Sequence, residues 1–566
     1  MASLTEITGV LGKARAAHLL RRATFGPTIQ EIEQFAALNV TEAMALLTDD
    51  SADDPTPPID PLTGETWVDP LGQAHAGGSN SKQDDLHEFF KSWHMDVMRQ
   101  AAPTLKERIT WFFHTHLPAR WTEINSSEGI YYQNLLFRFY AFGSFKTLFK
   151  KICVDNAMLR YLDCYSNRKN APNENFAREM FELYSIGKGR QIADGDYTNY
   201  TEDDIKAATR VLTGWQIDES FSYLDPDSGI PIGKMRSQFQ SDGGQNIEVA
   251  TEHDEGVKTF SEKFDNAEIS PATLLNGYPT VEAAYGELDE MIEMIFAREE
   301  TSRFIARKLY RFFAYHFISD EVEQDVIGPL ARHLRENDYN IVSMLELLMK
   351  SEHFYDEDDA AVENDLRGAL IKSPVDIFTS LFRFFGIGMP DRDSEPVRFY
   401  NEMGFVVNKL VDQGLNFYEP FEVAGYPAYH QVPGFNRNWI TSYALAHRYQ
   451  VGEILMRRVD ASEERTLYLD VLDWVENSAS IGDPSNATEI IDVFSENLLA
   501  VTLNQERYDY FLYTVFLDNP DDHTQALNTW AGEWNNYKSS GSADVVRERI
   551  ELLLSSLIQT PEFQLI

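Results

Sequence analysis

The chain has 566 residues, and its 43% hydrophobic and 13% aromatic content supplies a large core for roughly two to four domains. Ninety acidic residues against 49 basic ones give a formal charge of −41 at pH 7, which repels nucleic-acid phosphates and anionic membrane surfaces. These values predict a globular protein and exclude nucleic acid as a partner.

The N-terminus and the cysteines bear on the compartment. No basic segment followed by a continuous apolar one opens the chain, and no later stretch approaches about 20 apolar residues. We therefore expect a soluble, cytoplasmic protein without a membrane span, or an extracytoplasmic one if the sequence is a processed form. Cys153 and Cys164 are too few for a disulfide framework or a thiolate metal site. No zinc signature or phosphate-binding loop appears, so we predict no metal and no cofactor.

Two helices joined by a tight corner are predicted at the start of the chain. The first covers residues 13–22 and ends in Arg21 and Arg22, and a capping box from Thr28 to Glu31 starts the second. We interpret the arginine pair as surface charge that interacts with the helix dipole. The alternative is that one of them reaches carboxylates of a later helix.

After a polar loop at residues 50–82, a strongly apolar helix begins at Thr104 and ends before Pro118. His114 and His116 are nearly opposite each other on an ideal helix, so this pair does not form a bidentate metal site. Histidines on apolar helices are usually hydrogen-bonded core groups. A ligand-binding or catalytic role for His114 is the second interpretation.

The most informative helix is predicted at residues 173–186. At about 100° per residue, Asn175, Glu179 and Glu182 share one stripe, with Arg178 at its edge and apolar residues on another side. One interpretation is a solvated surface with Arg178 and Glu182 as an i,i+4 ion pair. The other is a buried polar site that uses the two carboxylates.

A second helix follows after Gly187, the expected left-handed end of the first. It starts with a capping box from Thr201 to Asp204 and stops at Gly214. Arg210 faces away from its apolar side.

These segments resemble the bacterial family catalogued as domain of unknown function 1800. The resemblance lies in six motifs spread over nearly the whole chain: AAHLLRRATFGPT at 16–28, ERITWFFHTH at 107–116, NENFAREMFELYSIG at 173–187, YTEDDIKAATRVLTGW at 200–215, HDEGVKTF at 253–260 and KSPVDIFTSLFRFFG at 372–386. The family has no assigned activity. Its members are commonly encoded beside proteins of the domain of unknown function 1501 family, which resembles the alkaline phosphatase and sulfatase superfamily, and this implies such a partner. Where the family often has His, this chain has Tyr184, which weakens a metal role for that helix.

The periodicity breaks at residues 218–255, where we expect an irregular insertion with one or two β-hairpins. Asp225 and Asp227 imitate the start of a calcium loop, but the bidentate Glu of such loops is missing. His253 and Asp254 are interpreted as part of a surface loop. They would suit a metal or a proton shuttle only if the insertion folds over the helix at 173–186.

A basic stripe follows on the helix after Thr301, where Arg303, Arg307 and Arg311 are spaced at i, i+4 and i+8. Glu299 can pair with the first of them. In the structural interpretation, Glu179 and Glu182 neutralise the others across a helix interface.

Beyond an acidic linker at 356–365, another helix starts at Ser373, Pro374 and Asp376 and ends at Gly386. An aromatic loop of about two dozen residues follows at 416–439, longer than connecting loops usually are. Its candidate binding residues are Tyr426, Tyr429, His430 and Trp439, together with Phe435. They are expected either to stack on sugar or peptide or to anchor the loop to the core.

The fold class that follows is mainly α: a large multi-helix body with one irregular insertion. We divide it into an N-terminal helical part at 1–217, the insertion at 218–255, a second helical part at 256–390 and a C-terminal helical part at 391–566.

Two functions remain open. The first is a binding or assembly partner of a phosphatase-like or sulfatase-like protein. The second is a hydrolase-type enzyme with Glu179 or Glu182 as general base, assisted by Asn175, Arg178 and His114 or His253.

Overall fold

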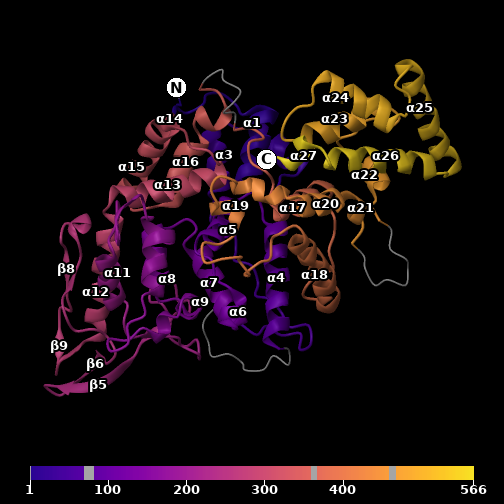
Figure 1. Ribbon diagram of the computed structural model, residues 1–566. Helices are drawn as coiled ribbons and strands as arrows, with labels where there is room; N and C mark the ends of the chain where they lie inside the picture. Colours follow the sequence, from indigo (N-terminus) through magenta and orange to yellow (C-terminus); the bar gives the residue numbers. More distant parts are fainter. Residues whose placement is uncertain (1, 69–81, 359–365, 458–466) are drawn as a thin grey trace.

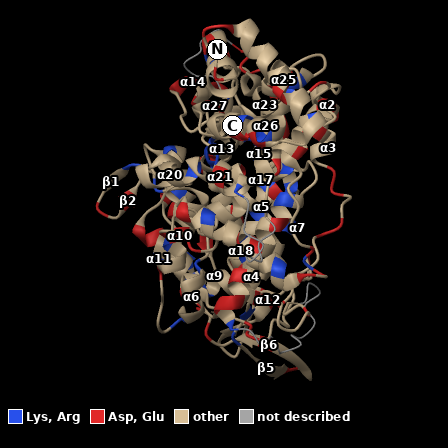
Figure 2. Ribbon diagram, turned by 90° about the vertical axis from the view of Figure 1, so that its right-hand side faces the viewer, with Lys and Arg blue, Asp and Glu red and all other residues tan. Residues whose placement is uncertain are grey.

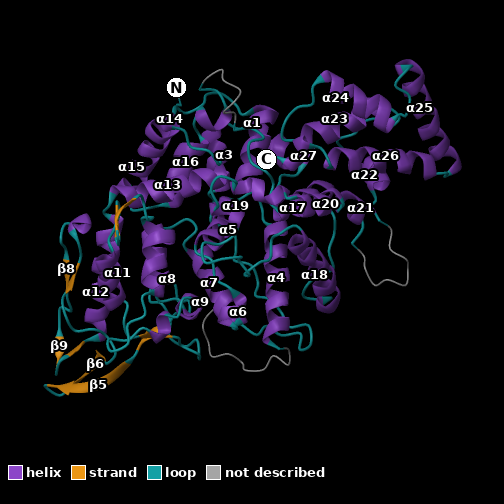
Figure 3. Ribbon diagram, in the orientation of Figure 1, coloured by secondary structure: helices purple, strands orange, loops and turns teal. Residues whose placement is uncertain are grey.

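The computed structural model describes residues 2–68, 82–358, 366–457 and 467–566. Over these residues the fold is mainly α-helical, as predicted, and its strands form only short antiparallel pairs (Figures 1 and 3). Part of the predicted loop at 50–82 and most of the acidic linker at 356–365 lie outside the described residues. No helix in the described ranges is long and apolar enough to cross a membrane.

The first nine helices form the centre of the body in Figure 1. Their bounds are α1 (Gly12–Ala23), α2 (Ile29–Ala36), α3 (Val40–Leu47), α4 (Gln83–Gln100), α5 (Leu105–His116), α6 (Trp121–Ile124), α7 (Ser127–Phe139), α8 (Phe145–Ile152) and α9 (Asn156–Tyr161). Every residue of α5 except Lys106 is buried, which fits its apolar sequence. Thr28 and Glu31 form the predicted capping box at the start of α2. The helix α5 therefore lies in the core of the body.

The predicted helix at 173–186 has two parts. It begins as α10 (Asn175–Glu179), not at residue 173, because the Asn173 side chain accepts from the amide of Asn175 and so remains outside the helix. A π-helical segment, Met180–Ser185, continues it. Gly187 ends it in the left-handed conformation at φ 73°, as expected. The wider π turn rotates residues 180–185 away from the positions of an ideal α-helix.

The strand pairs are β1 (Gln191–Ala193) with β2 (Asp196–Tyr197), β3 (Trp215–Gln216) with β4 (Lys234–Met235), β5 (Ser237–Asp242) with β6 (Gln245–Ala250), β7 (Lys258–Thr259) with β8 (Glu268–Ile269), and β9 (Leu274–Leu275) with β10 (Tyr278–Pro279). The longest strand pair, with β8 and β9, lies at the end of the body at the lower left of Figure 1. In the longest hairpin Asp242 opposes Gln245, and both turn residues, Gly243 and Gly244, have positive φ, as a two-residue hairpin turn requires. The helix α11 (Glu202–Val211) starts with the predicted Thr201–Asp204 capping box.

The remaining helices complete the body and form a C-terminal group at the upper right of Figure 1. They are α12 (Val281–Phe296), α13 (Glu299–Phe313), α14 (Asp320–Val322), α15 (Gly328–Glu336), α16 (Ile341–Met349), α17 (Pro374–Phe385), α18 (Pro396–Asp412), α19 (Pro427–His430), α20 (Ser442–Tyr449), α21 (Val451–Met456), α22 (Val471–Asn477), α23 (Ala487–Leu498), α24 (Gln505–Asp509), α25 (His523–Ser540), α26 (Asp544–Ile558) and α27 (Pro561–Gln564). The predicted start of α17 is confirmed, with a Ser373–Asp376 capping box and Gly386 at its left-handed end. One connected cluster of buried apolar residues extends from Ile7 to Phe563.

Candidate functional site

The aromatic loop folds over α5 and α13. The Tyr426 hydroxyl lies 3.1 Å from Nε2 of His114 and donates to the carbonyl of Asn416, while Trp111 Nε1 donates to the Tyr429 hydroxyl at 3.3 Å. Tyr426 is 2% exposed. These two tyrosines therefore anchor the loop to the core.

Burial lowers the pKa of His114 to about 3, so its imidazole is neutral at pH 7. Its ring contacts are with Trp111, Tyr418 and Tyr426. The structure thus places His114 beneath the aromatic loop and beside none of the carboxylates of the stripe.

A cavity of about 40 Å³ lies between the aromatic loop, α5 and α13. Its apolar wall consists of aromatic rings from all three elements, namely Phe112, Phe312, Tyr429, Phe435 and Trp439. Its polar wall consists of Arg108, His116, Lys308, Arg311, His316, Asp376 and His430. Three of the four predicted binding residues, Tyr429, His430 and Trp439, line this cavity.

The charge in the cavity comes from α13. Lys308 forms no hydrogen bond or ion pair with any described residue, and its ammonium group lies 5.3 Å from the centre of the Phe304 ring. Burial and the nearby Arg311 lower its pKa to about 8, so it is still mostly protonated at pH 7. Arg311 donates to the carbonyl of His316 and covers the Phe435 ring, again without a carboxylate partner among the described residues.

The other two arginines of the predicted stripe are fully paired. Arg303 binds Glu299 and Glu323, and Arg307 binds Glu300 and Glu323. The ion pair between Arg303 and Glu299 was predicted from the sequence. The prediction that Glu179 and Glu182 neutralise this stripe is wrong, because acidic residues at the start of α13 and in the π-helical segment after α14, Glu323–Ile327, reach the arginines instead.

The remaining titratable groups of the cavity carry little charge. Burial lowers the pKa values of His116, His316 and His430, so these imidazoles are neutral at pH 7. Asp376 accepts from Arg108 at 2.5 Å, which neutralises both. Lys308 and Arg311 therefore leave the cavity with a net positive charge, although basic residues are sparse and interspersed with acidic ones over the rest of the chain (Figure 2).

The stripe on α10 and its π-helical continuation forms a second polar region. Arg178 binds Glu174 and Glu202, so the predicted Arg178–Glu182 pair is absent. Glu182 instead accepts from Lys188 at 3.1 Å and from the Tyr200 hydroxyl at 3.2 Å. The π turn accounts for this change. In an ideal α-helix Glu182 would lie on the same face as Arg178, and the wider π turn rotates it away from that face.

Glu179 is half-buried and has no hydrogen-bond or ion-pair partner among the described residues. Burial and the neighbouring Glu182 raise its pKa. Asn175 directs its side-chain amide to the carbonyl of Leu162 at 3.4 Å. Only Glu179 in this region therefore keeps a free carboxylate.

We expect Glu179→Gln to raise the midpoint of thermal unfolding at pH 7. A carboxylate whose folded pKa lies above its unfolded value costs stability once it ionises, and the cost is absent below about pH 4. The gain should therefore vanish as the pH falls through that value. Glu182→Gln removes a partly exposed pair with Lys188 and should change stability by less than about 1 kcal/mol. A lower midpoint for Glu179→Gln at pH 7 would contradict the unpaired geometry.

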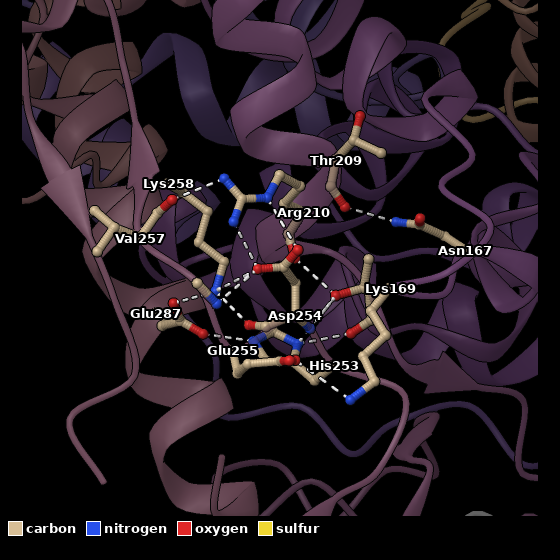
Figure 4. A network of polar contacts seen from close by, with 12 residues as sticks. Asn167, Lys169, Thr209, Arg210, His253, Asp254, Glu255, Val257, Lys258 and Glu287 are labelled. Carbon is tan, nitrogen blue, oxygen red and sulfur yellow. Dashed lines mark hydrogen bonds and ion pairs between the residues drawn. The ribbon is translucent and has the colours of Figure 1, made fainter. Parts of the chain in front are cut away.

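A third polar cluster consists of His253, Lys258 and Glu287, which are buried and partnered at the centre of the network in Figure 4. His253 donates from Nδ1 to the Thr213 carbonyl at 2.8 Å, and its Nε2 lies 2.5 Å from a carboxylate oxygen of Glu287. Lys258 donates to the other oxygen of Glu287 at 2.5 Å. All three side chains of this ion-pair cluster are at most 1% exposed, so the surface-loop interpretation of His253 is wrong.

Two further sequence predictions are settled by contacts. Lys151 Nζ lies 2.5 Å from Asp225 and from Asp227, so an ammonium group takes the position that a cation would need in the imitated calcium loop. No group of three or more metal-ligating side chains occurs within the described ranges.

Arg21 and Arg22 are buried and donate to the carbonyls of Asn497 and Leu366. These contacts exclude both predictions for the pair, a surface location and a contact with the carboxylates of α10.

Comparison with known proteins gives one match. A family model described as protein of unknown function (DUF1800) covers residues 18–565. No curated protein and no solved structure matches the chain.

Proposed function

Since the chain belongs to the DUF1800 family, whose description names no activity, we propose a function from its geometry: it is a binding protein that takes an anionic group into the cavity beneath the aromatic loop. The observation that carries the proposal is Lys308. It is a cation without a partner among the described residues, beside Arg311, in a protein of formal charge −41.

The energetic argument is that an unpaired, desolvated cation costs stability unless an anion meets it. Acidic side chains are abundant, and Arg303 and Arg307 on the same helix both have them. The absence of a carboxylate at Lys308 and Arg311 therefore leaves two donors for a ligand. The aromatic rings opposite them favour a ligand with an apolar body behind its anionic group.

A protein can also carry the anionic group. The family resemblance supports an assembly partner from the domain of unknown function 1501 family, which resembles the alkaline phosphatase and sulfatase superfamily. An acidic side chain of such a partner would meet the same two cations. Mixing the two proteins on a size-exclusion column tests this assignment, and a Lys308→Met, Arg311→Met double variant should elute uncomplexed.

The alternative is a hydrolase that uses Glu179 as general base. It is favoured by the unpaired, half-buried carboxylate with its raised pKa. Against it, Glu182 is occupied by Lys188 and Tyr200, so the two carboxylates do not act as a free pair. An enzyme of this kind loses all turnover in Glu179→Gln, whereas ligand binding in the aromatic cavity does not change.

The binding proposal is tested by a thermal-shift comparison of benzoate and phenyl phosphate with the neutral benzyl alcohol. We expect at least one anion to raise the unfolding midpoint of the wild type, and the alcohol to leave it unchanged. The shift should disappear in Lys308→Met and persist in Lys206→Met, which removes an exposed lysine paired with Asp203. Equal shifts in wild type and Lys308→Met would overturn the proposal.

The same variant should be more stable than the wild type without ligand. The folded pKa of Lys308, about 8, lies below the unfolded value, so the protonated amine costs stability below pH 8. We expect Lys308→Met to gain roughly 2 kcal/mol at pH 7, with partial exposure allowed for. The stability difference between Lys308→Met and the wild type should decrease to zero as the pH rises from 8 through about 10.4, the pKa of an unfolded lysine. Urea unfolding at pH 7 and pH 10 measures it, and a loss at pH 7 would show that Lys308 has a stabilising partner.

A further inference from the structure

A second group of cations lies behind the aromatic cavity, on the side of α1, α17 and α20. It consists of Arg21, Arg22, Arg108, Lys372 and Arg448, which are all between 0% and 9% exposed. Only Asp376, through Arg108, forms an ion pair with any of the five in the described part of the chain. We call this group the buried cation cluster.

The hydrogen bonds of the cluster do not compensate its charge. Arg21 donates to the carbonyl of Asn497, Arg22 to that of Leu366, and Arg448 to that of Lys372. These acceptors are neutral. Several guanidinium nitrogens have no acceptor in the part of the chain that the structure describes: Nε and Nη1 of Arg22, Nε of Arg108 and Nη1 of Arg448.

Asp376 cannot serve more of the cluster. One of its oxygens accepts from Arg108, and the other accepts from the amide and the hydroxyl of Ser373 in the capping box of α17. Both oxygens are therefore committed. Among the described residues, Asp376 forms the one ion pair of these five buried cations, and Asp356 acts on Arg22 only at longer range, so positive charge remains in excess there and destabilises the fold.

A small cavity of about 20 Å³ opens within the cluster, lined by Arg21, Lys372 and Asp376 together with Ser380, Asn497, Ile566 and apolar groups. The Lys372 ammonium group contacts the Phe563 ring at 3.7 Å and forms no hydrogen bond or ion pair with a described residue. A space of this size holds one water-sized species. A monatomic anion therefore fits it.

We propose that this cavity is a binding site for one small inorganic anion of the size of chloride, held by Lys372 and Arg21. The anion supplies the charge that Asp376 does not. It bridges α1 to the segment before α17 and, through the Lys372 carbonyl, to Arg448 on α20. The site differs from the proposed ligand cavity in its cations, because neither Lys308 nor Arg311 lines it, although Asp376 lines both cavities.

The test is urea unfolding of the full chain in sodium chloride and in sodium gluconate at equal ionic strength. We expect the midpoint of the wild type to rise with chloride and to saturate, because a ligand that binds only the folded state stabilises it by mass action. Gluconate is too large for the cavity and serves as the reference. The chloride-specific rise should be lost in Lys372→Met and in Arg21→Met.

Lys308→Met is the matched control, since it removes a half-buried lysine from the other cavity and should keep the full chloride response. Crystals soaked in bromide provide a second measurement, with an anomalous peak expected between Arg21 and Lys372. If a water fills the cavity instead, chloride and gluconate will give the same midpoints, the variants will behave as the wild type does, and no peak will appear. That result would overturn the proposal.

Discussion

Asp376→Asn is expected to destabilise the folded protein by about 3–5 kcal/mol. The change keeps the size of the side chain and an oxygen for the capping box of α17. It removes the negative charge that pairs with Arg108 at 2.5 Å inside the buried cation cluster. The loss arises because Arg108, at 4% exposure, becomes an uncompensated buried charge.

Urea unfolding at pH 7 measures this effect. The matched control is Asp203→Asn, which breaks the exposed pair with Lys206 and should cost less than about 1 kcal/mol. If Asp376→Asn is as mild as the control, the cation cluster is not held by that carboxylate.

Glu287→Gln should have an effect of similar size, about 3–5 kcal/mol, at the other end of the body. Glu287 is 1% exposed and serves both His253 and Lys258 (Figure 4). Glutamine keeps one acceptor but leaves the Lys258 ammonium group without its charge partner. The contact between α12 and the strand pairs would weaken first, because these residues join the two.

A double variant separates a lost charge balance from lost packing. Glu287→Leu with Lys258→Met removes both charges, and replacing a buried pair by apolar groups is often close to neutral. We expect the double variant to be more stable than Glu287→Gln. A double variant as unstable as the single one would show that packing, not the charge, holds this region together.

Local signals in the sequence predict the parts of this fold that depend on neighbouring residues. The capping boxes at Thr28, Thr201 and Ser373 and the left-handed Gly386 need only contacts within one turn, and all four are present. The family resemblance, carried by motifs along the chain, is likewise confirmed by the match over residues 18–565.

Long-range charge pairing explains most of what the sequence could not show. Glu323 pairs with Arg303 and Arg307 from a π-helical segment that the helical periodicity does not connect to them. The sequence therefore could not show which cations of α13 have a carboxylate partner and that Lys308 lacks one among the described residues. Glu287 lies 34 residues from His253, and no pattern joins the two. The π turn at 180–185 likewise left no signal, although it decides where Glu182 points.

For the candidate binding residues, too, local sequence signals predicted one part and long-range packing decided the other. The composition and length of the aromatic loop indicated a structured, functional segment, and it does line a cavity with Tyr429, His430 and Trp439. The burial of Tyr426 against His114 depends on the packing of the loop over α5, which the sequence does not encode locally.

The central claim is that the protonated amine of Lys308 recognises an anion. Calorimetric titration with phenyl phosphate from pH 7 to pH 9.5 tests it most directly. The groups facing Lys308 are Arg311, which stays charged, and His116 and His430, which stay neutral over this range. The affinity of the wild type should fall about tenfold per pH unit above pH 8, as Lys308 loses its proton, and that of Lys308→Met should be weak at every pH. An affinity that does not change with pH, or a Lys308→Met variant that binds as the wild type does, would contradict the account.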